Sequence, residues 1–507
     1  MSDAMLFGLA IGLPIVAAIG VTLTRAYPNV REAVSIGAGL GLCATVIAIG
    51  TRVLGATAEA GGVTHVLQVL PGLDIAFAAE PLGLLFASIA SMLWVVTTVY
   101  AIGYLRGNDE PRQTTFFAFA AIAIGSSMGI AFAANLFTLF LCYEALTLAT
   151  YPLVAMKGDT AARRGARTYL IWLLATSVLG LLPAIVGVHV IAGALDFHLG
   201  GTIPARVSDE LVLWLSILFA YGIGKAALMP VHRWLPAAMV APTPVSALLH
   251  AVAVVKAGVF CIVKIIVYVF GMDLFSAADT TDWLVYAAGI TVLAASIIAL
   301  RQDNLKRRLA YSTVSQLSYV IMAAALATPL AMTGAILHIA AHALGKITLF
   351  FAAGAIYTAA HKTRVSELNG IGRRMPITMI AFAIGACGMI GLPPTAGFIG
   401  KWYLLAGALA AEDVFVLVVI FASTLLNAAY FAPLIYNAFF RREPAADVHA
   451  SAAAHASPGG HASPGGHGEA PWPMLVAMGI TAVGSLALFF VPDLPLAIAN
   501  RITGVLP

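Results

Sequence analysis

Glu144 is the first candidate in this sequence for a residue with a chemical role. It is the single carboxylate in the apolar stretch AFAANLFTLFLCYEALTLATYPLVAM, and a helix over 133–156 would hold it about 17 Å from either end. That depth is close to the middle of a hydrocarbon core roughly 30 Å thick. A charged side chain there costs at least ~2.5 kcal/mol and usually has a partner. A mid-depth acid, with lysines in other apolar stretches, predicts a path for protons or ions.

Lys225 is the first candidate partner for Glu144. A nearby carboxylate favours the charged form of a lysine, so moving Glu144 toward or away from Lys225 would change how firmly the lysine holds its proton. The alternative is a static structural ion pair. Pro230, which breaks the helix just after Lys225, argues for a movable arrangement because a static pair needs no break.

Two further apolar stretches carry titratable side chains. His250 and Lys256 are six residues apart in TPVSALLHAVAVVKAG, about 240° around a helix, so we expect one to face the seventh span and the other the second half of the chain. His338, His342 and Lys346 fall at i, i+4 and i+8 in HIAAHALGKITLF and form one stripe of groups, two of which titrate near neutrality. The alternatives are ordinary buried histidines or a packing stripe. A zinc site is disfavoured because no HExxH motif is present.

Lys401 follows a Pro- and Gly-rich break and is expected in the outer half of the membrane, as an exit for protons or as a simple loop lysine. The predicted relay therefore runs through Glu144, Lys225, Lys256, Lys346 and Lys401. Lys264 is expected to extend its ammonium to the outer interface. The stretch RLAYSTVSQLSYV offers side chains to hold bridging waters: Tyr311, Ser312, Thr313, Ser315, Gln316, Ser318 and Tyr319.

The composition determines the class of protein that must position these residues. The chain is 61% hydrophobic and 10% charged, with a mean hydropathy of +0.95, whereas soluble domains carry about 25% charged residues. This predicts an all-α membrane protein and excludes nucleic-acid binding. No CxxC pair occurs among Cys43, Cys142, Cys261 and Cys387, so we expect neither an iron–sulfur cluster nor another metal or cofactor.

Hydropathy predicts about fourteen transmembrane helices, and the N-terminus, which lacks a basic region, reads as the first of them and not as a signal peptide. The predicted spans are 3–24, 32–54, 78–103, 114–132, 133–156, 165–193, 210–229, 244–270, 283–300, 307–327, 330–358, 375–396, 409–439 and 473–495. Most of the 27 Lys and Arg residues then fall in loops on one side, which the positive-inside rule makes cytoplasmic. Both termini are accordingly predicted on the outer face.

Two spans are predicted to be broken. Span 7 runs into KAALMPVHRWLPAAMVAPTPVS and span 12 into GMIGLPPTAGFIGKW. Broken backbone at membrane depth is tolerated where it lines a cavity, and paired breaks indicate inverted repeats with the working site between them. We therefore predict peripheral helices over 1–113, a first repeat over 114–270 (spans 4–8), a second over 283–439 (spans 9–13), and a C-terminal helix within 473–507.

Between the second repeat and the last helix, residues 440–472 are rich in His, Ala, Gly and Pro. HASPGG occurs twice, and four histidines recur every six residues, at His449, His455, His461 and His467. This spacing does not stack ligands on one helix face, and the composition cannot form a core. We interpret the tract as a flexible cytoplasmic linker, with metal binding as the alternative.

The stretches that carry these residues match those of a known family. The chain resembles the antiporter-like, proton-translocating subunits shared by respiratory complex I, membrane-bound hydrogenases and Mrp-type sodium/proton antiporters. The resemblance rests on stretches such as NLFTLFLCYEALTLATYPLV, IGKAALMPVHRWLPAAMVAPTPVSALLHAVAVVKAG, LKRRLAYSTVSQLSYV, HIAAHALGKITLFFAAGAI and MIGLPPTAGFIGKWYL. It implies fourteen helices with two inverted five-helix repeats. It also implies a proton relay through Glu144, Lys225, His250, Lys256, His338, His342, Lys346 and Lys401.

Within this family, two features favour a resemblance to the D-type subunit of Mrp antiporters. The last relay position is lysine at Lys401, where one complex I subunit type has glutamate, and the sequence leaves no room for the lateral helix of the largest such subunit. We expect a multi-pass subunit of the bacterial inner membrane that exchanges H+ for a monovalent cation such as Na+, beside other membrane subunits and with no redox chemistry of its own. The open alternatives are a proton-pumping subunit of an NADH-quinone oxidoreductase or hydrogenase, a quinone-binding redox subunit, and a structural or assembly protein.

Overall fold

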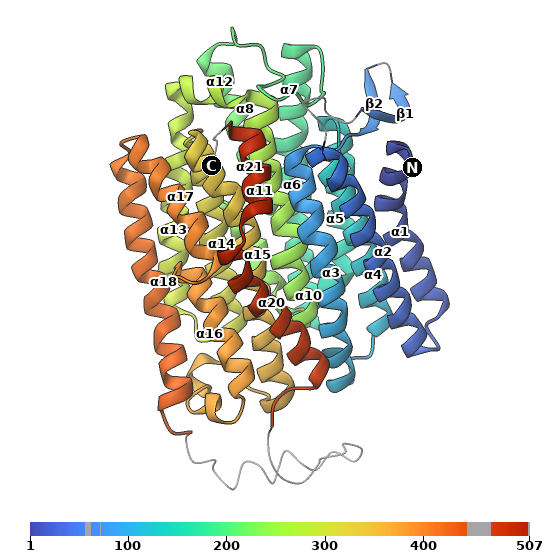
Figure 1. Ribbon diagram of the computed structural model, residues 1–507, viewed down its shortest axis with the longest axis vertical. Coiled ribbons are helices and arrows are strands. Elements are labelled where there is room, and N and C mark those ends of the chain that lie inside the picture. Colours follow the sequence, from blue (N-terminus) through green and yellow to red (C-terminus); the bar gives the residue numbers. More distant parts are fainter. Residues whose placement is uncertain (56–61, 71, 444–467, 505–507) are drawn as a thin grey trace.

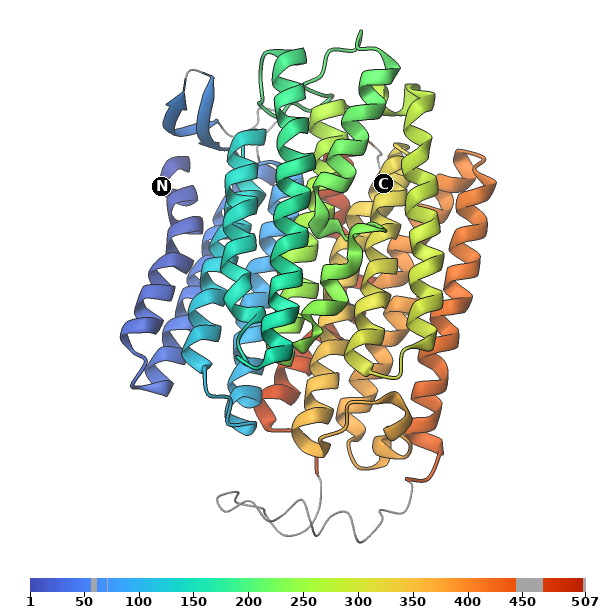
Figure 2. The ribbon, with the colours of Figure 1, turned by 180° about the vertical axis from the view of Figure 1, so that it is seen from behind.

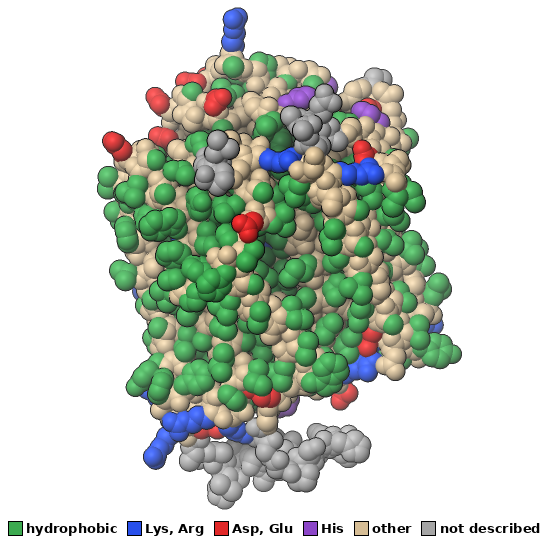
Figure 3. Space-filling view, viewed as in Figure 1, with side chains coloured by type: hydrophobic (Ala, Val, Ile, Leu, Met, Phe, Trp, Pro, Cys, Tyr) green, Lys and Arg blue, Asp and Glu red, His purple; other side chains and the backbone are tan. Residues whose placement is uncertain are grey.

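The computed structural model of the chain describes residues 1–55, 62–70, 72–443 and 468–504. Long helices run side by side along one axis, and α1 begins in the same half of the molecule in which α21 ends (Figures 1 and 2). Hydrophobic side chains cover the lateral face of the bundle, while charged side chains gather toward its two ends (Figure 3). This distribution is the one that a lipid-embedded protein requires.

The first helices form one flank of the bundle: α1 (Asp3–Leu23), α2 (Pro28–Gly55) and α3 (Pro81–Gly107). Between α2 and α3 lies an antiparallel hairpin that the sequence analysis missed, β1 (Thr64–Leu70) and β2 (Leu73–Phe77). Its turn contains Gly72 at φ +79°, a conformation that glycine adopts without strain. The backbone after β2 bonds to the α4–α5 connection, from the Ala78 N–H to the Phe132 carbonyl.

The middle of the chain contains both regular and interrupted helices. In order they are α4 (Gln113–Phe132), α5 (Leu136–Val154), α6 (Thr160–Thr176), η1 (Ser177–Leu181), α7 (Leu182–Ala192), α8 (Asp209–Gly222), η2 (Gly224–Ala226), η3 (Val231–Arg233), α9 (Trp234–Ala237), η4 (Ala238–Val240), α10 (Thr243–Ala247), η5 (Leu248–Val252), α11 (Val254–Lys264) and η6 (Ile265–Phe270).

The remaining elements complete the bundle. They are α12 (Met272–Ala277), η7 (Asp279–Thr281), α13 (Asp282–Arg301), α14 (Leu305–Ala325), α15 (Pro329–Ala360), η8 (Val365–Glu367), η9 (Ile371–Arg373), α16 (Pro376–Ile390), α17 (Ala396–Ala410), α18 (Val414–Phe440), α20 (Trp472–Phe490) and α21 (Asp493–Thr503). The helix in the last predicted span, 473–495, therefore ends at Phe490, earlier than predicted, and the separate helix α21 follows it.

The prediction of an all-α membrane protein is confirmed. Among the described residues, 11 helical segments are long and apolar enough to cross a membrane, and α16 and α17 are shorter apolar helices. The predicted count of fourteen is not confirmed, because broken spans divide into short pieces and polar side chains interrupt the apolar run of α14. The division into two five-helix repeats stays a prediction.

Both predicted breaks are present. The seventh span ends as a helix at Gly222 and continues through short turns, with Ala227 at φ +58°. The twelfth span ends at Ile390, where Gly391 has φ +89°, and resumes in α17. A third interruption was not predicted: the eighth span passes through the π-helical segments η5 and η6, so its side chains depart from regular α-helical spacing.

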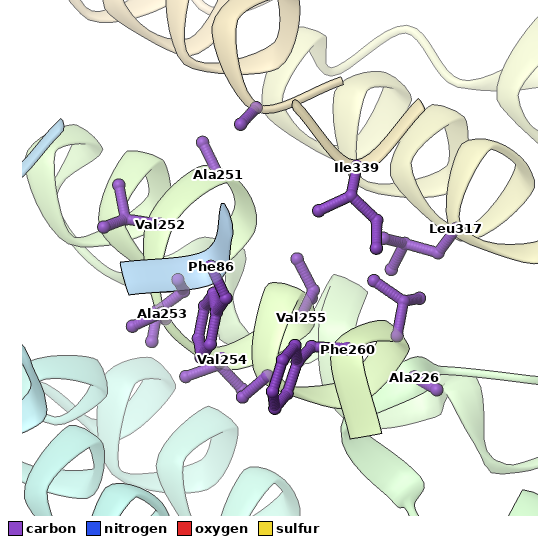
Figure 4. Close-up of a cluster of buried hydrophobic side chains, with 14 of the residues drawn as sticks. Phe86, Ala226, Ala251, Val252, Ala253, Val254, Val255, Phe260, Leu317 and Ile339 are labelled. Carbon is purple, nitrogen blue, oxygen red and sulfur yellow. The ribbon is translucent and has the colours of Figure 1, made fainter. Parts of the chain in front are cut away.

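The core lies around the eighth span and α15. The segment Thr243–Phe270 is 100% buried and Pro329–Ala360 is 94% buried over their most apolar windows, which places both helices inside the bundle. Apolar side chains from four parts of the chain meet beside α11, among them Phe86, Val255, Leu317 and Ile339 (Figure 4). The lysines and histidines of these two helices are therefore shielded from lipid by neighbouring helices.

Most of the predicted His-rich linker, with its four histidines, lies outside the described residues. Its two described flanks are held on the connection between α15 and α16. Glu443 forms ion pairs with Lys362 at 2.6 Å and Arg374 at 2.8 Å. Glu469 accepts hydrogen bonds from Thr378, from its backbone N–H at 3.3 Å and its hydroxyl at 2.6 Å. The chain therefore leaves and re-enters the bundle at the same end.

Candidate functional site

Glu144 lies in the middle of α5, whose N-terminus is capped by the Asn135 side chain accepting from the Thr138 N–H at 2.8 Å. Both carboxylate oxygens of Glu144 are shielded from solvent and have no hydrogen-bond partner among the described residues. A carboxylate in this state is costly unless it binds a proton or meets a positive charge. Glu144 is therefore an acid inside the bundle without a partner among the described residues.

Lys225 lies in η2, directly after the break in the seventh span, and is fully buried. Its ammonium donates to the Tyr143 carbonyl at 2.8 Å and to the Thr147 hydroxyl at 2.5 Å. The same Nζ atom lies 3.1 Å from the centroid of the Tyr143 ring. No ion pair joins Lys225 to Glu144 among the described residues, so the direct partners of the ammonium are Tyr143 and Thr147.

Tyr143 and Thr147 are site residues that the sequence analysis missed. They flank Glu144 at i−1 and i+3 on α5, and the Tyr143 hydroxyl also accepts from the Lys225 backbone N–H at 3.1 Å. Their positions in the sequence could have identified them, because polar side chains within one turn of a mid-membrane acid are candidate hydrogen-bond partners for a lysine near that acid. Lys225 is therefore held by the helix that carries Glu144, through residues within one turn of it in the sequence.

Lys256 lies on α11 and contacts α15. Its Nζ atom is 2.7 Å from Nδ1 of His342 and donates to the Ile339 carbonyl at 2.9 Å. Two residues further along, Gly258 lies against the backbone of Lys225, where an added Cβ would be 2.3 Å from the lysine's carbonyl carbon. The close approach of α11 to the broken seventh span brings the two lysine-bearing segments together.

His250 also faces the second half of the chain. Its Nδ1 is 3.2 Å from the Thr313 hydroxyl, and its ring centroid is 4.7 Å from that of Phe350. The expectation that His250 and Lys256 face different halves is wrong, because both contact α14 or α15. The π-helical segment η5 explains the difference, since its wider turn departs from the 100° per residue that the expectation assumed.

Lys346, on α15, binds a hydroxyl group of α14. Its ammonium donates to the Ser312 hydroxyl at 2.8 Å, and the hydroxyls of Ser312 and Tyr430, on α18, lie 3.0 Å apart. Tyr430 also bonds to Asn427. Lys346 is thus linked to α14 and, through Ser312, to α18.

Lys401 lies on α17 and binds the end of α16. Its ammonium donates to the carbonyls of Met389 at 3.0 Å and Ile390 at 2.9 Å, and it lies 4.8 Å from the centroid of the Tyr319 ring. The last carbonyls of a helix have no intrahelical partners and carry partial negative charge. The break in the twelfth span therefore creates the binding site for this lysine.

The polar residues of α14 bond directly to the titratable groups of neighbouring helices. Ser312 accepts from Lys346, Thr313 contacts His250, and Gln316 contacts His338 through its side-chain oxygen at 3.0 Å. Ser315 bonds to Ser296 at 2.9 Å. These residues make direct contacts, and the expectation that they also hold bridging waters stays a prediction.

The expected placement of Lys264 at the outer interface is wrong. Its side chain is fully buried and forms an ion pair with Glu80 at 2.9 Å, just before α3, while its ammonium donates to the Ala133 carbonyl at 2.8 Å. Its Nζ atom also lies 4.3 Å from the centroid of the Phe197 ring. The hairpin and the α4–α5 connection cover this end of α11, so the lysine has a local partner and needs no access to the interface.

The chain is similar in sequence to subunits of known membrane complexes. Residues 133–427 match the family described as NADH:quinone oxidoreductase/Mrp antiporter, TM. NADH-quinone oxidoreductase subunit N of Desulforudis audaxviator is 33% identical over 422 residues, covering 82% of each chain. The A/B subunit of a probable K(+)/H(+) antiporter of Rhizobium meliloti is 32% identical over 400 residues, which are 76% of this chain and 39% of that protein.

A solved structure shares the fold. A chain in the structure of the Mrp complex from Dietzia sp. DQ12-45-1b matches with a TM-score of 0.84, covering 99% of this chain and 97% of that chain. The sequence identity is 21%, so this likeness concerns the architecture alone. The course of the helices described above is therefore one that a solved structure also has.

Proposed function

Because the chain belongs to the NADH:quinone oxidoreductase/Mrp antiporter transmembrane family, we propose that it moves protons through the membrane as one subunit of a multisubunit complex. The observation that carries this proposal is the row of polar contacts inside the bundle. Lys256 contacts His342, the ring of His338 lies 6.3 Å from that of His342, and Gln316 bridges His338 to the carbonyl that Lys401 also binds. Ionisable side chains inside a membrane bundle are costly and mark paths for protons or ions, so a row of them supports a proton relay.

Protons enter the row from the cytoplasmic side through the first predicted repeat, at Lys225. Glu144 controls the charge of Lys225 from the same helix that holds its ammonium. Protons pass on through Lys256 and the α15 histidines and leave near Lys401. His250 and Lys346 lie beside this route and exchange protons with it. The drive comes from a partner subunit or an ion gradient, because the groups of this row hold and pass protons without redox chemistry.

The coupled process that we favour is monovalent cation/H+ antiport in the bacterial inner membrane. Lysine at position 401 supports it, as does the similarity to the antiporter protein from Rhizobium meliloti. The second candidate is a proton-pumping subunit of an NADH-quinone oxidoreductase. The even coverage of the Desulforudis audaxviator protein, 82% of both chains, favours that candidate.

The proposal is tested by substituting Glu144 and Lys225, where protons enter the route to Lys256, in the complete complex. Glu144→Gln and Lys225→Ala should each abolish proton transport in inverted membrane vesicles while the complex still assembles. Glu210→Gln and Lys157→Ala are matched controls, since both side chains are exposed. Full transport by either relay variant would refute the proposal. Transport driven by a sodium or potassium gradient identifies antiport, and transport driven by NADH identifies the redox alternative.

A further inference from the structure

Gln316 occupies the gap between the α15 histidines and the break that holds Lys401. Its side-chain oxygen lies 3.0 Å from Nε2 of His338, and its side-chain N–H donates to the Met389 carbonyl at 3.2 Å. The same carbonyl accepts from Lys401 at 3.0 Å. Gln316 is fully buried, and His338 is 3% exposed. One amide thus connects a titratable side chain on α15 to the last turn of α16.

The direction of these bonds assigns the tautomer of His338. Because the amide N–H of Gln316 donates to a carbonyl, its oxygen must be the atom that faces the histidine. An oxygen only accepts, so Nε2 of His338 carries a hydrogen and Nδ1 carries the lone pair. Nδ1 is buried and has no hydrogen-bond partner in the described part of the chain.

We propose that Gln316 is a positioning residue that holds His338 in its Nε2–H form and ties it, through the Met389 carbonyl, to Lys401. This inference rests on the proposed proton relay. An amide oxygen is too weak a base to accept the Nε2 proton, so His338 gains and loses its mobile proton at Nδ1. Protonation forms the Nδ1–H bond and gives an imidazolium. Loss of that same proton restores the starting tautomer, while the Nε2–H bond stays intact.

The shared carbonyl gives this arrangement a connection to the twelfth span. Met389 is the penultimate residue of α16, and its carbonyl accepts from Gln316 and Lys401 together. A change in the contact between Lys401 and this carbonyl alters the same acceptor that orients the amide. Gln316 therefore couples the state of Lys401 to the nitrogen on which His338 exchanges its proton.

The first test replaces Gln316 in the complete complex. Gln316→Leu keeps the approximate volume and removes both bonds, and it should lower proton transport about tenfold, since a lost positioning bond of ordinary strength corresponds to that factor. Gln316→Glu mimics the amide only when its carboxyl is protonated. Its transport should be near the parental rate at acidic pH and fall as the pH rises, because the ionised carboxylate holds the imidazolium and cannot donate to Met389.

A double substitution separates positioning from packing. If Gln316 acts through His338, the pH dependence that Gln316→Glu introduces should disappear in a His338→Gln background, and Gln316→Leu should add no further loss there. If Gln316 only fills space, each substitution should have the same effect in both backgrounds. A parental pH profile for Gln316→Glu would also overturn the inference, and this result can be read even where the Leu variant fails to assemble.

Two controls complete the design. Gln302→Leu is the same substitution at the C-terminal end of α13, where the side chain bonds only to its own helix at the Ile298 carbonyl, and it should leave transport unchanged. Lys225→Ala distinguishes failure of this inference from failure of the proposed function. If Lys225→Ala abolishes transport while the Gln316 variants behave as the parent, this inference fails alone. If Lys225→Ala also transports normally, the proposed function fails.

Discussion

The Nζ atom of Lys256 lies 2.7 Å from Nδ1 of His342, across the contact between α11 and α15. The two residues come from helices that are 100% and 94% buried over their most apolar windows, so neither group can reach solvent directly. In its ammonium form Lys256 can only donate, so in that state Nδ1 of His342 accepts and Nε2 carries the ring hydrogen. The pair is suited to passing a proton from the lysine to the imidazole, because the acceptor lone pair already faces the donor.

Removing the acceptor of this pair should stop transfer at the middle of the path. We expect His342→Ala to lower proton transport by at least about a hundredfold, the lower range for loss of a positioned proton carrier. Lys256 keeps its bond to the Ile339 carbonyl, so the complex should still assemble. Transport is measured in vesicles against His189→Ala, a histidine in the last turn of α7. Undiminished transport by the His342 variant would place the route elsewhere.

The Thr147 hydroxyl should help to set the position of the Lys225 ammonium. Thr147→Val keeps the shape and removes one acceptor, while the Tyr143 carbonyl remains. Loss of one hydrogen bond to a charged group corresponds to about 1.5–3 kcal/mol, so transport should fall by roughly tenfold to a hundredfold. Thr168→Val, on the exposed side of α6, is the control. Equal rates for the two valine variants would show that Thr147 does not hold the lysine.

The approach of α11 to Lys225 should require glycine at position 258. An added Cβ in Gly258→Ala would lie 2.3 Å from a backbone carbonyl carbon, which cannot move like the end of a side chain. We expect a loss of at least about 1–3 kcal/mol in the free energy of unfolding, measured by thermal unfolding of the purified complex. Gly479→Ala, in α20, has open space at the same point and should be neutral or stabilising. Similar melting curves for both variants would contradict the packing described for α11.

The buried pair of Lys264 and Glu80 should be sensitive to the removal of one partner. Glu80→Gln leaves a buried ammonium without its counter-ion and should cost about 3–5 kcal/mol. Combining it with Lys264→Met removes the unpaired charge and should recover much of that loss. The measurement is the thermal stability and yield of the complex. A double variant as unstable as Glu80→Gln alone would show that charge pairing is not what holds this end of α11.

Acid should release the contact that Glu443 makes at the end of the bundle where α18 ends. The hydrogen bond from Lys362, followed by that from Arg374, lowers the pKa of Glu443 below its usual value. A lowered pKa means that the contact stabilises the structure at neutral pH and is lost as the pH falls through the folded-state value. Hydrogen exchange in residues 361–375 should therefore quicken on acidification, and Glu443→Gln should exchange quickly already at neutral pH. Glu412→Gln, at an exposed position beyond α17, should follow the parent.

The overall class and the positions of the main interruptions were predictable from the sequence. Low charge and long apolar runs leave a helical bundle in lipid as the outcome, because exposed backbone groups cannot be satisfied there. Prolines after Lys225 and the Pro–Pro and Gly residues before Lys401 cannot continue a regular helix, so the breaks follow from local chemistry. The spacing of His338 and His342 likewise determines that they share one face of α15.

The partners of the buried charges were decided by tertiary structure. Lys225 bonds to Tyr143 and Thr147 in place of the Glu144 carboxylate, and Lys264 meets Glu80 far away in the chain. The hairpin Thr64–Phe77 was missed because a short alternating stretch between two long helices reads as a loop until backbone groups of the α4–α5 connection lie beside it.

Sequence alone thus determined which groups lie deep in the membrane and where the helices break, since both depend on neighbours within one or two turns. Only the folded chain decided which lysine meets which acceptor. The reason is physical: a hydrogen bond depends on tenths of an ångström and on direction, and π-helical turns such as η5 shift side chains by more than that. Gln316 illustrates the division, because its place on α14 is readable from the sequence, whereas its contacts with His338 and Met389 come from the packing of three helices.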